Sequence, residues 1–167
     1  ETEIALDETD RYSRTFINGV WLDNLGLEAP TTVDELYDVL VAFRDNDPNG
    51  NGQKDEIPYC VVGKDYPHRM FYDLLGSWGF GINGVMDSDY AFSWLDIDDA
   101  GKVRFIGRED KFKNMVEFYN KLWTEGLADK EIYSQDQTQA AAKVNAGQVG
   151  FVARAQYTQW MGAAAEN

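Results

Sequence analysis

Residues 45–56 read Asp-Asn-Asp-Pro-Asn-Gly-Asn-Gly-Gln-Lys-Asp-Glu, a loop dense in carboxylate and carboxamide side chains. Calcium is bound by several oxygen atoms, and alternate residues of a tight loop can direct such oxygens inward while glycine permits the sharp turn. Ordinary turns also use Asp, Asn, Gly and Pro. Because the oxygen donors recur at alternate positions along the whole stretch, which a plain connection does not need, the sequence favours a calcium loop.

Two registers of such a loop fit the sequence. Counting from Asp45 gives the EF-hand spacing, with oxygen side chains at alternate positions, a central glycine and Glu56 at the end. Counting from Asp47 places the proline where no ligand is needed and brings two adjacent carboxylates to the closing side of the site. We prefer the second register. Its expected ligands for a structural Ca²⁺ ion are Asp47, Asn49, Asn51, the Gln53 backbone carbonyl, Asp55 and Glu56.

Composition limits the class of protein and its partners. The 167 residues are 44% apolar, which suits one domain with a sizeable core, and no apolar run is long enough to span a membrane. A formal charge of -14 disfavours nucleic acid and anionic membrane surfaces as partners. Cys60, the single cysteine, is flanked by valines and is expected to be a buried apolar residue. The chain begins at Glu1, and we expect it to be part of something longer.

Capping and periodicity predict an α+β, mostly helical fold. Thr32 and Glu35 form a capping box that starts a helix over 33–44. Apolar spacing predicts a second helix over 110–125, and turn composition predicts a hairpin near 93–106 in which Asp96, Asp98 and Asp99 form a charged turn rather than a metal site. A short strand is expected near 149–152.

Weaker patterns complete the expected order of elements. Asn18 and Gly26 are expected to bound a short helix over 17–25. Trp21 and Trp123 fall on helix stripes and are expected in the core. The remaining expectations are an edge strand or tail over 1–6, a buried strand over 57–62, helices over 68–78 and 135–146, an irregular segment over 127–133, and a helical or loop segment over 153–161.

Four stretches together resemble a known family. Residues 16–36 match the pattern (F/Y)-I-N-x-x-W-L-D-x-L-G-L-x-x-P-T-T-x-D-E-L, and residues 47–58 match D-P-x-G-N-G-x-x-D-E-I-P. Residues 119–127 and 146–151 look like the Y-x-x-L-(Y/W)-x-E-G-L helix end and the A-G-x-V-G strand entry. With these matches the chain resembles the extracellular solute-binding proteins of carbohydrate ABC transporters, whose calcium-carrying members, including alginate-binding proteins, place the ion at residues 47–56.

The resemblance implies a receptor without catalytic chemistry. Such proteins have a two-lobed, periplasmic-binding-protein-like fold of type II, hold an oligosaccharide in the cleft between the lobes, and deliver it to a membrane permease. Residues 1–167 would form one lobe. The resemblance further implies an extracellular, cell-surface lipoprotein or a periplasmic protein, attached to the membrane only through a lipid anchor that this chain does not carry.

Sugar-binding residues are expected among aromatic side chains outside the firm helix stripes. Sugar rings stack their C–H faces on aromatic rings, and their hydroxyls bond to a few polar groups. The residues expected to line the cleft are Trp78, Trp160, Tyr12 and Tyr157, with Arg11, Arg154 and Gln156 as polar neighbours.

Two other classes of function remain open at this point. A calcium-stabilised, carbohydrate-active enzyme domain would need a carboxylate pair that flanks the bond to be cleaved, and only the separation in space could reveal such a pair among 29 acids. A docking or adhesion module stabilised by calcium is the other class. It usually needs two calcium loops, whereas this chain has one.

Overall fold

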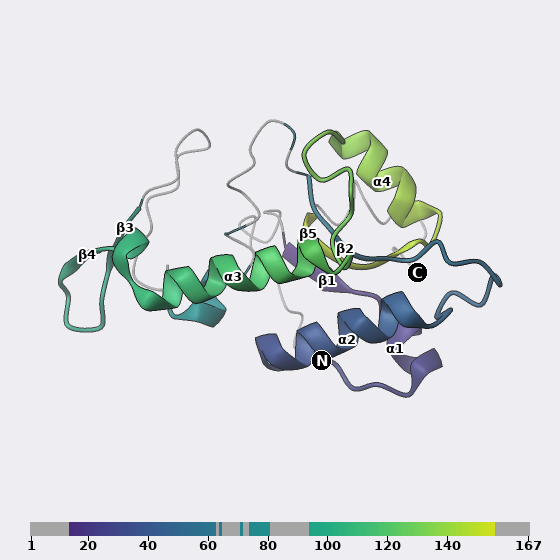
Figure 1. The fold of residues 1–167 in the computed structure, drawn as a ribbon, viewed down its shortest axis with the longest axis horizontal. Coiled ribbons are helices and arrows are strands. Elements are labelled where there is room, and N and C mark those ends of the chain that lie inside the picture. The colour runs from purple at the N-terminus through teal and green to yellow at the C-terminus, as the bar shows by residue number, and fades with distance from the viewer. Residues whose placement is uncertain (1–13, 63, 65–70, 72–73, 81–93, 156–167) are drawn as a thin grey trace, which may run out of the picture.

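A three-stranded sheet lies at the centre of the fold. The computed structural model describes residues 14–62, 64, 71, 74–80 and 94–155 (Figure 1). The strands are β1 (Arg14–Ile17), β2 (Ile57–Cys60) and β5 (Val149–Ala155), in the order β1-β5-β2. The middle strand β5 pairs antiparallel with β1 and parallel with β2, so the sheet is mixed.

Helices cover the sheet and connect it to a separate hairpin. The helices are α1 (Gly19–Leu25), α2 (Val33–Asp45), α3 (Asp110–Thr124) and α4 (Gln137–Asn145), and the 3₁₀ turns are η3 (Leu75–Trp78) and η4 (Ile106–Arg108). The hairpin consists of β3 (Leu95–Ile97) and β4 (Val103–Phe105). Figure 1 shows α3 running from the sheet to this hairpin, which lies at one end of the molecule. Among the described residues, every helix falls short of the length and apolarity needed to cross a membrane.

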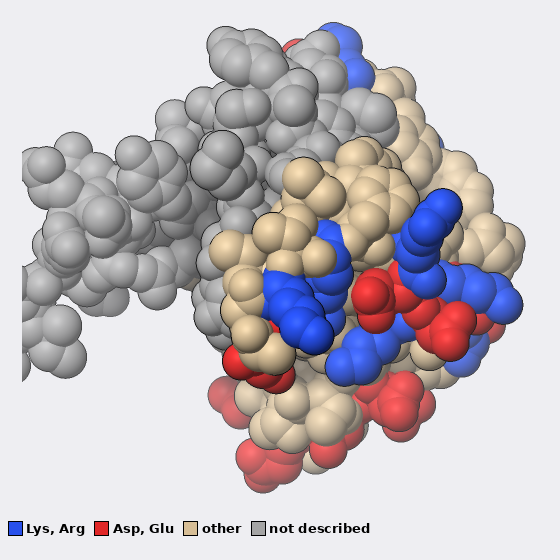
Figure 2. Space-filling model, turned by 90° about the vertical axis from the view of Figure 1, so that its left-hand side faces the viewer, with Lys and Arg blue, Asp and Glu red and all other residues tan. Residues whose placement is uncertain are grey.

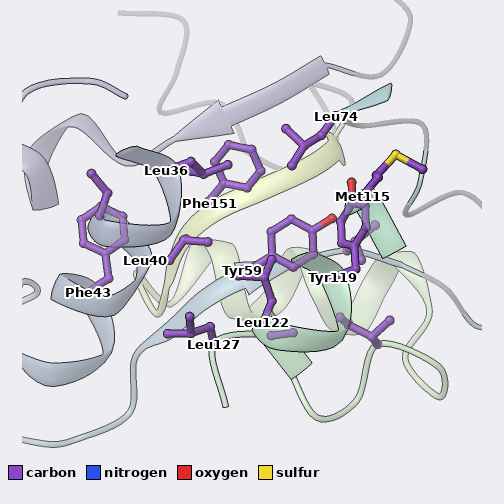
Figure 3. Close-up of a cluster of buried hydrophobic side chains, with 14 of the residues drawn as sticks. Leu36, Leu40, Phe43, Tyr59, Leu74, Met115, Tyr119, Leu122, Leu127 and Phe151 are labelled. Atoms are coloured by element: carbon purple, nitrogen blue, oxygen red, sulfur yellow. The ribbon is translucent and has the colours of Figure 1, made fainter. Parts of the chain in front are cut away.

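The two faces of the sheet pack against different helices because side chains alternate along a strand. Tyr59 and Phe151 stack on one face at 5.6 Å between ring centroids, in the cluster that includes residues of α2 and α3 (Figure 3). Cys60 and Val152 point to the other face and pack with Ala140 of α4. The parallel register, in which Tyr59 pairs with Phe151 and Cys60 with Val152, fixes both layers at once.

Close packing of α1 and α2 on β5 depends on Gly150. A Cβ atom at this position would lie 2.3 Å from Cδ2 of Phe43 and 2.9 Å from Cζ3 of Trp21. Those two rings meet edge to face, with 5.1 Å between their centroids. A larger residue at 150 would therefore force the helices away from the sheet.

The predicted helix boundaries are confirmed where local capping signals specify them. Asn18 accepts a hydrogen bond from the Trp21 amide, and Gly26 adopts φ 66° at the end of α1. Thr32 and Glu35 form both bonds of the capping box, and the hydrogen bonds from Thr31 and Thr32 lower the pKa of Glu35. The helices 33–44 and 110–125, the hairpin 93–106, the buried strand within 57–62, the helix within 135–146 and the strand 149–152 are present.

Three expectations are wrong. Residues 14–17 form β1, although the sequence placed Ile17 at the start of a helix, and residues 153–155 extend β5 instead of beginning a helical or loop segment. Both segments become strands because they pair with each other, as Arg14 with Ala155 shows. Trp123 is 44% exposed, not in the core, whereas Trp21 is buried as predicted. The expected segments 1–6 and most of 68–78 lie outside the described residues.

Candidate functional site

The acidic loop follows α2 directly and leads into β2. Gly50 and Gly52 adopt φ 70° and 75°, a left-handed conformation that glycine reaches without steric cost. The Gly50 amide donates to the Asp47 carbonyl at 3.2 Å and closes the turn. The loop therefore doubles back on itself within a few residues.

Four of the expected ligand side chains join in one hydrogen-bond network. Asp47 accepts from the amides of Asn51 at 3.1 Å and Gly52 at 2.8 Å. The Nδ2 groups of Asn49 and Asn51 both donate to Oδ1 of Asp55, at 3.1 and 3.0 Å. The structure thus brings Asp47, Asn49, Asn51 and Asp55 together across the loop.

Two residues outside the loop hold it in place. Nε2 of Gln148, next to the start of β5, donates to Oδ2 of Asp55 at 2.9 Å, and Nδ2 of Asn24 in α1 donates to the Pro48 carbonyl at 2.8 Å. Hydrogen bonds from Gln148, Asn51 and Asn49, in that order, lower the pKa of Asp55. Sequence reasoning missed the roles of Gln148 and Asn24, since no local pattern links residues so distant in the chain.

Glu56 has no hydrogen-bond partner in the part of the chain that the structure describes. Both of its carboxylate oxygens are buried. Burial raises the pKa of Glu56, and the neighbouring charges of Asp55 and Asp47 raise it further. A buried carboxylate without a partner is costly unless a cation compensates it. A positive charge close to the oxygens of the loop would compensate Glu56.

Asp45 takes no part in this network. Both of its carboxylate oxygens accept from Arg44, with Nε to Oδ1 at 2.7 Å and Nη2 to Oδ2 at 2.9 Å. Gln53 donates its amide to Oδ1 of Asn51 at 2.7 Å, which places its backbone at the rim of the network. The first residue of the alternative EF-hand register is thus already paired with its neighbour.

The donor set fits a hard cation when its amide oxygens are included. Among the described residues, no group of three His, Cys, Asp or Glu side chains is arranged to hold a metal. Carboxamide and backbone oxygens would therefore have to complete any site. Half a turn of the Asn49 or Asn51 carboxamide exchanges N–H for oxygen at the same position. Such an all-oxygen set suits Ca²⁺ and not a soft metal.

Most of the residues expected to bind sugar lie outside the description. These are Arg11, Tyr12, Gln156, Tyr157 and Trp160, and of Arg154 the structure describes only the backbone, in β5. Trp78 is half-buried in η3, with its ring centroid 6.2 Å from that of Phe118. Its indole Nε1 is buried and has no hydrogen-bond partner among the described residues. The cleft assignment remains a prediction.

Two further expectations concern Cys60 and the aspartates of the hairpin. Cys60 is buried as expected, and burial, together with the charge of Asp129, raises the pKa of its thiol to about 12, which disfavours the thiolate form at neutral pH. Asp98 accepts from the amides of Ala100 and Lys102, and Asp98 and Asp99 lie in the turn between β3 and β4 as expected, whereas Asp96 lies in β3 and pairs with Arg104.

Comparison with known proteins gives consistent matches. The sequence pattern of the family described as bacterial extracellular solute-binding protein matches residues 8–166. The fructooligosaccharide ABC transporter substrate-binding protein FusA of Streptococcus pneumoniae is 39% identical over 128 residues, which cover 77% of this chain and 22% of FusA. The chain therefore spans less than a quarter of that relative.

Solved structures of related proteins match most of the chain. FusA in complex with kestose is 32% identical with a TM-score of 0.70, over 92% of this chain and 29% of that one. An EF-hand mutant of FusA in complex with fructo-nystose matches equally well, at 31% identity and a TM-score of 0.70, over the same shares. The alginate-binding protein AlgQ2 without calcium ion is 27% identical with a TM-score of 0.61, over 86% of this chain and 27% of that one.

Proposed function

Because the chain belongs to the family of bacterial extracellular solute-binding proteins, we propose that it is part of the substrate-binding component of an ABC transporter for carbohydrate uptake. Its α+β fold is that of part of a periplasmic-binding-protein-like receptor. One observation carries the proposal: 92% of the chain superposes, at 32% identity, on a protein that holds the oligosaccharide kestose. This likeness favours a receptor over an enzyme domain or a docking module.

The proposed mechanism is capture without chemistry. Residues 1–167 form one lobe, and the oligosaccharide is held in a cleft between this lobe and a second one outside the cell. The cleft side of this lobe carries Trp78, Trp160, Tyr12 and Tyr157 as stacking surfaces, with Arg11, Arg154 and Gln156 bonding to hydroxyls. A permease then receives the sugar unchanged, so no acid, base or nucleophile is needed.

Calcium has a structural role in this proposal. Asp47, Asn49, Asn51, the Gln53 carbonyl, Asp55 and Glu56 would hold the ion where the loop joins α2 to β2. The partnerless Glu56 supports the site, and so does the pairing of Asp45 with Arg44, which favours the register that begins at Asp47. The ion supplies a positive charge to carboxylates that would otherwise repel one another.

Calorimetry tests whether the protein binds an oligosaccharide without cleaving it. The intact protein is titrated with kestose and with other neutral oligosaccharides, and the bound sugar is then recovered and analysed. We expect saturable heat for at least one oligosaccharide and its recovery without cleavage. Enzymatic turnover that disappears when one carboxylate is mutated would contradict the proposal.

Thermal unfolding tests the calcium site. At millimolar calcium and the Kd of about 10⁻⁴ to 10⁻³ M typical of extracellular modules, the ion contributes on the order of 1 kcal/mol. Asp47→Ala and Asp55→Ala should each remove the calcium-dependent rise in Tm, whereas the control Asp45→Ala should keep it. The EF-hand register predicts instead that Asp45→Ala removes the calcium-dependent rise in Tm. If calcium does not change the Tm of the native protein, the proposed site is absent.

A further inference from the structure

A cavity lies between α3 and the irregular segment that follows it. Its volume is about 220 Å³. Figure 3 shows three of its inner side chains, Tyr59, Tyr119 and Leu122, close together between β2 and α3. The lining residues are Tyr59, Phe71, Val116, Tyr119, Asn120, Leu122, Trp123, Ala128 and Tyr133.

Two exposed aromatic rings belong to this lining. Trp123, from the last turn of α3, is 44% exposed, and Tyr133, from the segment after it, is 51% exposed. Their ring centroids lie 5.7 Å apart and their planes are tilted by 52°. An indole and a phenol ring are thus held side by side beside a cavity, each with much of its surface open to solvent. Trp123 therefore lies at the cavity and not in the core, where its place on the apolar stripe of the helix had predicted it.

Trp78, the predicted cleft residue whose side chain the structure describes, does not line the cavity. It contacts α3 through Phe118. Val116 and Asn120 each lie two residues from Phe118, which places them about 200° around the helix from it. Val116 and Asn120 therefore lie on the side of α3 away from Phe118, whereas Leu122, four residues after Phe118, lies on the same side as Phe118.

The chemistry of the lining restricts what can bind. The described lining residues are all uncharged, which suits a neutral ligand. Aromatic rings with a few amide and phenol groups suit a molecule that has an apolar C–H face and hydroxyls around its edge, which describes a sugar ring. Drug-sized ligands occupy pockets of about 300–1,000 Å³, so the smaller volume here suits one ring and not an oligosaccharide.

We propose that this cavity binds a single neutral sugar ring that stacks on Trp123, as a second carbohydrate site separate from the interlobe cleft. Tyr133 flanks the stacked ring, and Asn120 is the carboxamide that bonds to its hydroxyls. The test does not depend on the proposed transport function, because it follows a monosaccharide at Trp123, which is not one of the predicted cleft residues. Either proposal can fail while the other holds.

The test follows the indole N–H signal of Trp123 by NMR during titration with D-glucose and with D-fructose. The signal is identified by its disappearance in Trp123→Phe. We expect it to shift and saturate with at least one sugar at millimolar concentration. Trp94 is the matched control, because it is 40% exposed and does not line the cavity, and its signal should stay in place.

Variants separate this site from the cleft. Tyr133→Ala and Asn120→Ala should weaken the monosaccharide titration by about tenfold, as expected when a stacking or bonding partner is lost, while Trp94→Ala leaves it unchanged. Trp123→Ala should retain the calorimetric affinity for kestose. Absence of a saturable shift with either sugar overturns the proposal. Cyclohexanol, an apolar ring with one hydroxyl, is titrated as a further control. A shift of the Trp123 signal with cyclohexanol and not with either sugar would show a purely apolar site and would also overturn the proposal.

Discussion

Glu56 and Asp96 are both buried carboxylates in acidic segments, and their surroundings differ. Asp96 is 1% exposed, and its Oδ2 accepts from Nε and Nη2 of Arg104 at 3.0 and 2.6 Å. Glu56 has no partner of this kind among the described residues. The hairpin thus carries its own counter-charge. The described part of the chain supplies no such counter-charge to Glu56, which is why we propose that the loop binds a cation and the hairpin does not.

The register of the hairpin explains how it achieves this. Asp96 and Arg104 are cross-strand partners whose side chains share one face, while the exposed pairs Leu95 with Phe105 and Ile97 with Val103 take the other. Figure 2 shows Lys and Arg side chains among Asp and Glu on the hairpin end of the molecule. In residues 45–56, by contrast, the one basic side chain is Lys54, and oxygen donors dominate. The two acidic segments therefore differ in their counter-charges, since the hairpin places Arg104 opposite Asp96 and residues 45–56 contain mostly oxygen donors.

Removal of the counter-charge in the hairpin should have the largest effect. Arg104→Met removes the counter-charge of the buried Asp96, and the free energy of unfolding should fall by about 3 kcal/mol, the lower end of the range because Arg104 is partly exposed. Urea unfolding measures the change. The double variant Asp96→Leu with Arg104→Met removes both charges and should recover most of the loss. Equal stability of the single and double variants would show that the loss does not come from the uncompensated charge of Asp96.

A third buried carboxylate, Asp129, provides an intermediate case. Nζ of Lys143 in α4 bonds to Asp129 at 2.7 Å, to Glu131 at 2.7 Å and to Oε1 of Gln135 at 2.9 Å. Lys143→Met should lower the free energy of unfolding by about 2 kcal/mol, since Asp129 keeps some access to solvent. Lys130→Met, at an exposed neighbouring lysine, is the control and should change little.

The same lysine should make stability depend on alkaline pH. Burial alone would lower the pKa of Lys143, but its bonds to Asp129 and Glu131 outweigh burial and raise it. A group with a raised folded pKa stabilises fully below its unfolded pKa of about 10.4, and this contribution is lost as pH rises through the folded value. Between pH 9 and 12 the free energy of unfolding should therefore fall less steeply with pH in Lys143→Met than in the native protein. Urea unfolding at several pH values measures the two slopes. An unchanged slope would show that Lys143 is not responsible.

The smallest effect should have the opposite sign. Glu56→Gln removes a buried charge that lacks a partner, so in a chelating buffer the variant should be more stable than the native protein by about 1 kcal/mol or less. With millimolar calcium the order should reverse, because the variant loses a ligand. Asp96→Asn is the matched isosteric change, and it should destabilise in both buffers. A destabilised Glu56→Gln in chelator would mean that Glu56 is already compensated.

Local chemistry made much of the fold predictable. The capping box at Thr32 and Glu35 and the left-handed Gly26 specify helix ends through neighbouring residues alone. The donor spacing of the loop likewise identified the side chains that meet in the network. These features depend on residues a few positions apart, and so the sequence contains them in full.

What could not be predicted depends on distant pairing. Arg14–Ile17 becomes a strand because β5 pairs with it. The local sequence of these four residues does not indicate that they pair with residues far along the chain. The side chain of Gln148 reaches Asp55 across 93 positions of sequence. Trp123 follows Leu122, which is fully buried, and helical periodicity alone cannot decide which of two adjacent apolar residues reaches the core.

The position of β5 sets the order in which this fold can assemble. It is the middle strand of the sheet, yet it is the last strand in the described chain. As the chain emerges from a ribosome, Tyr59 of β2 can bridge to Ala128, but the described pairing of β1 and β2 with β5 must wait until residues 149–155 appear. Closure of such long-range pairings is slow because the entropy of ordering the intervening chain is lost before contacts repay it. A nascent chain of this sequence should therefore stay open, and accessible to holding factors, until nearly all of these residues have been made.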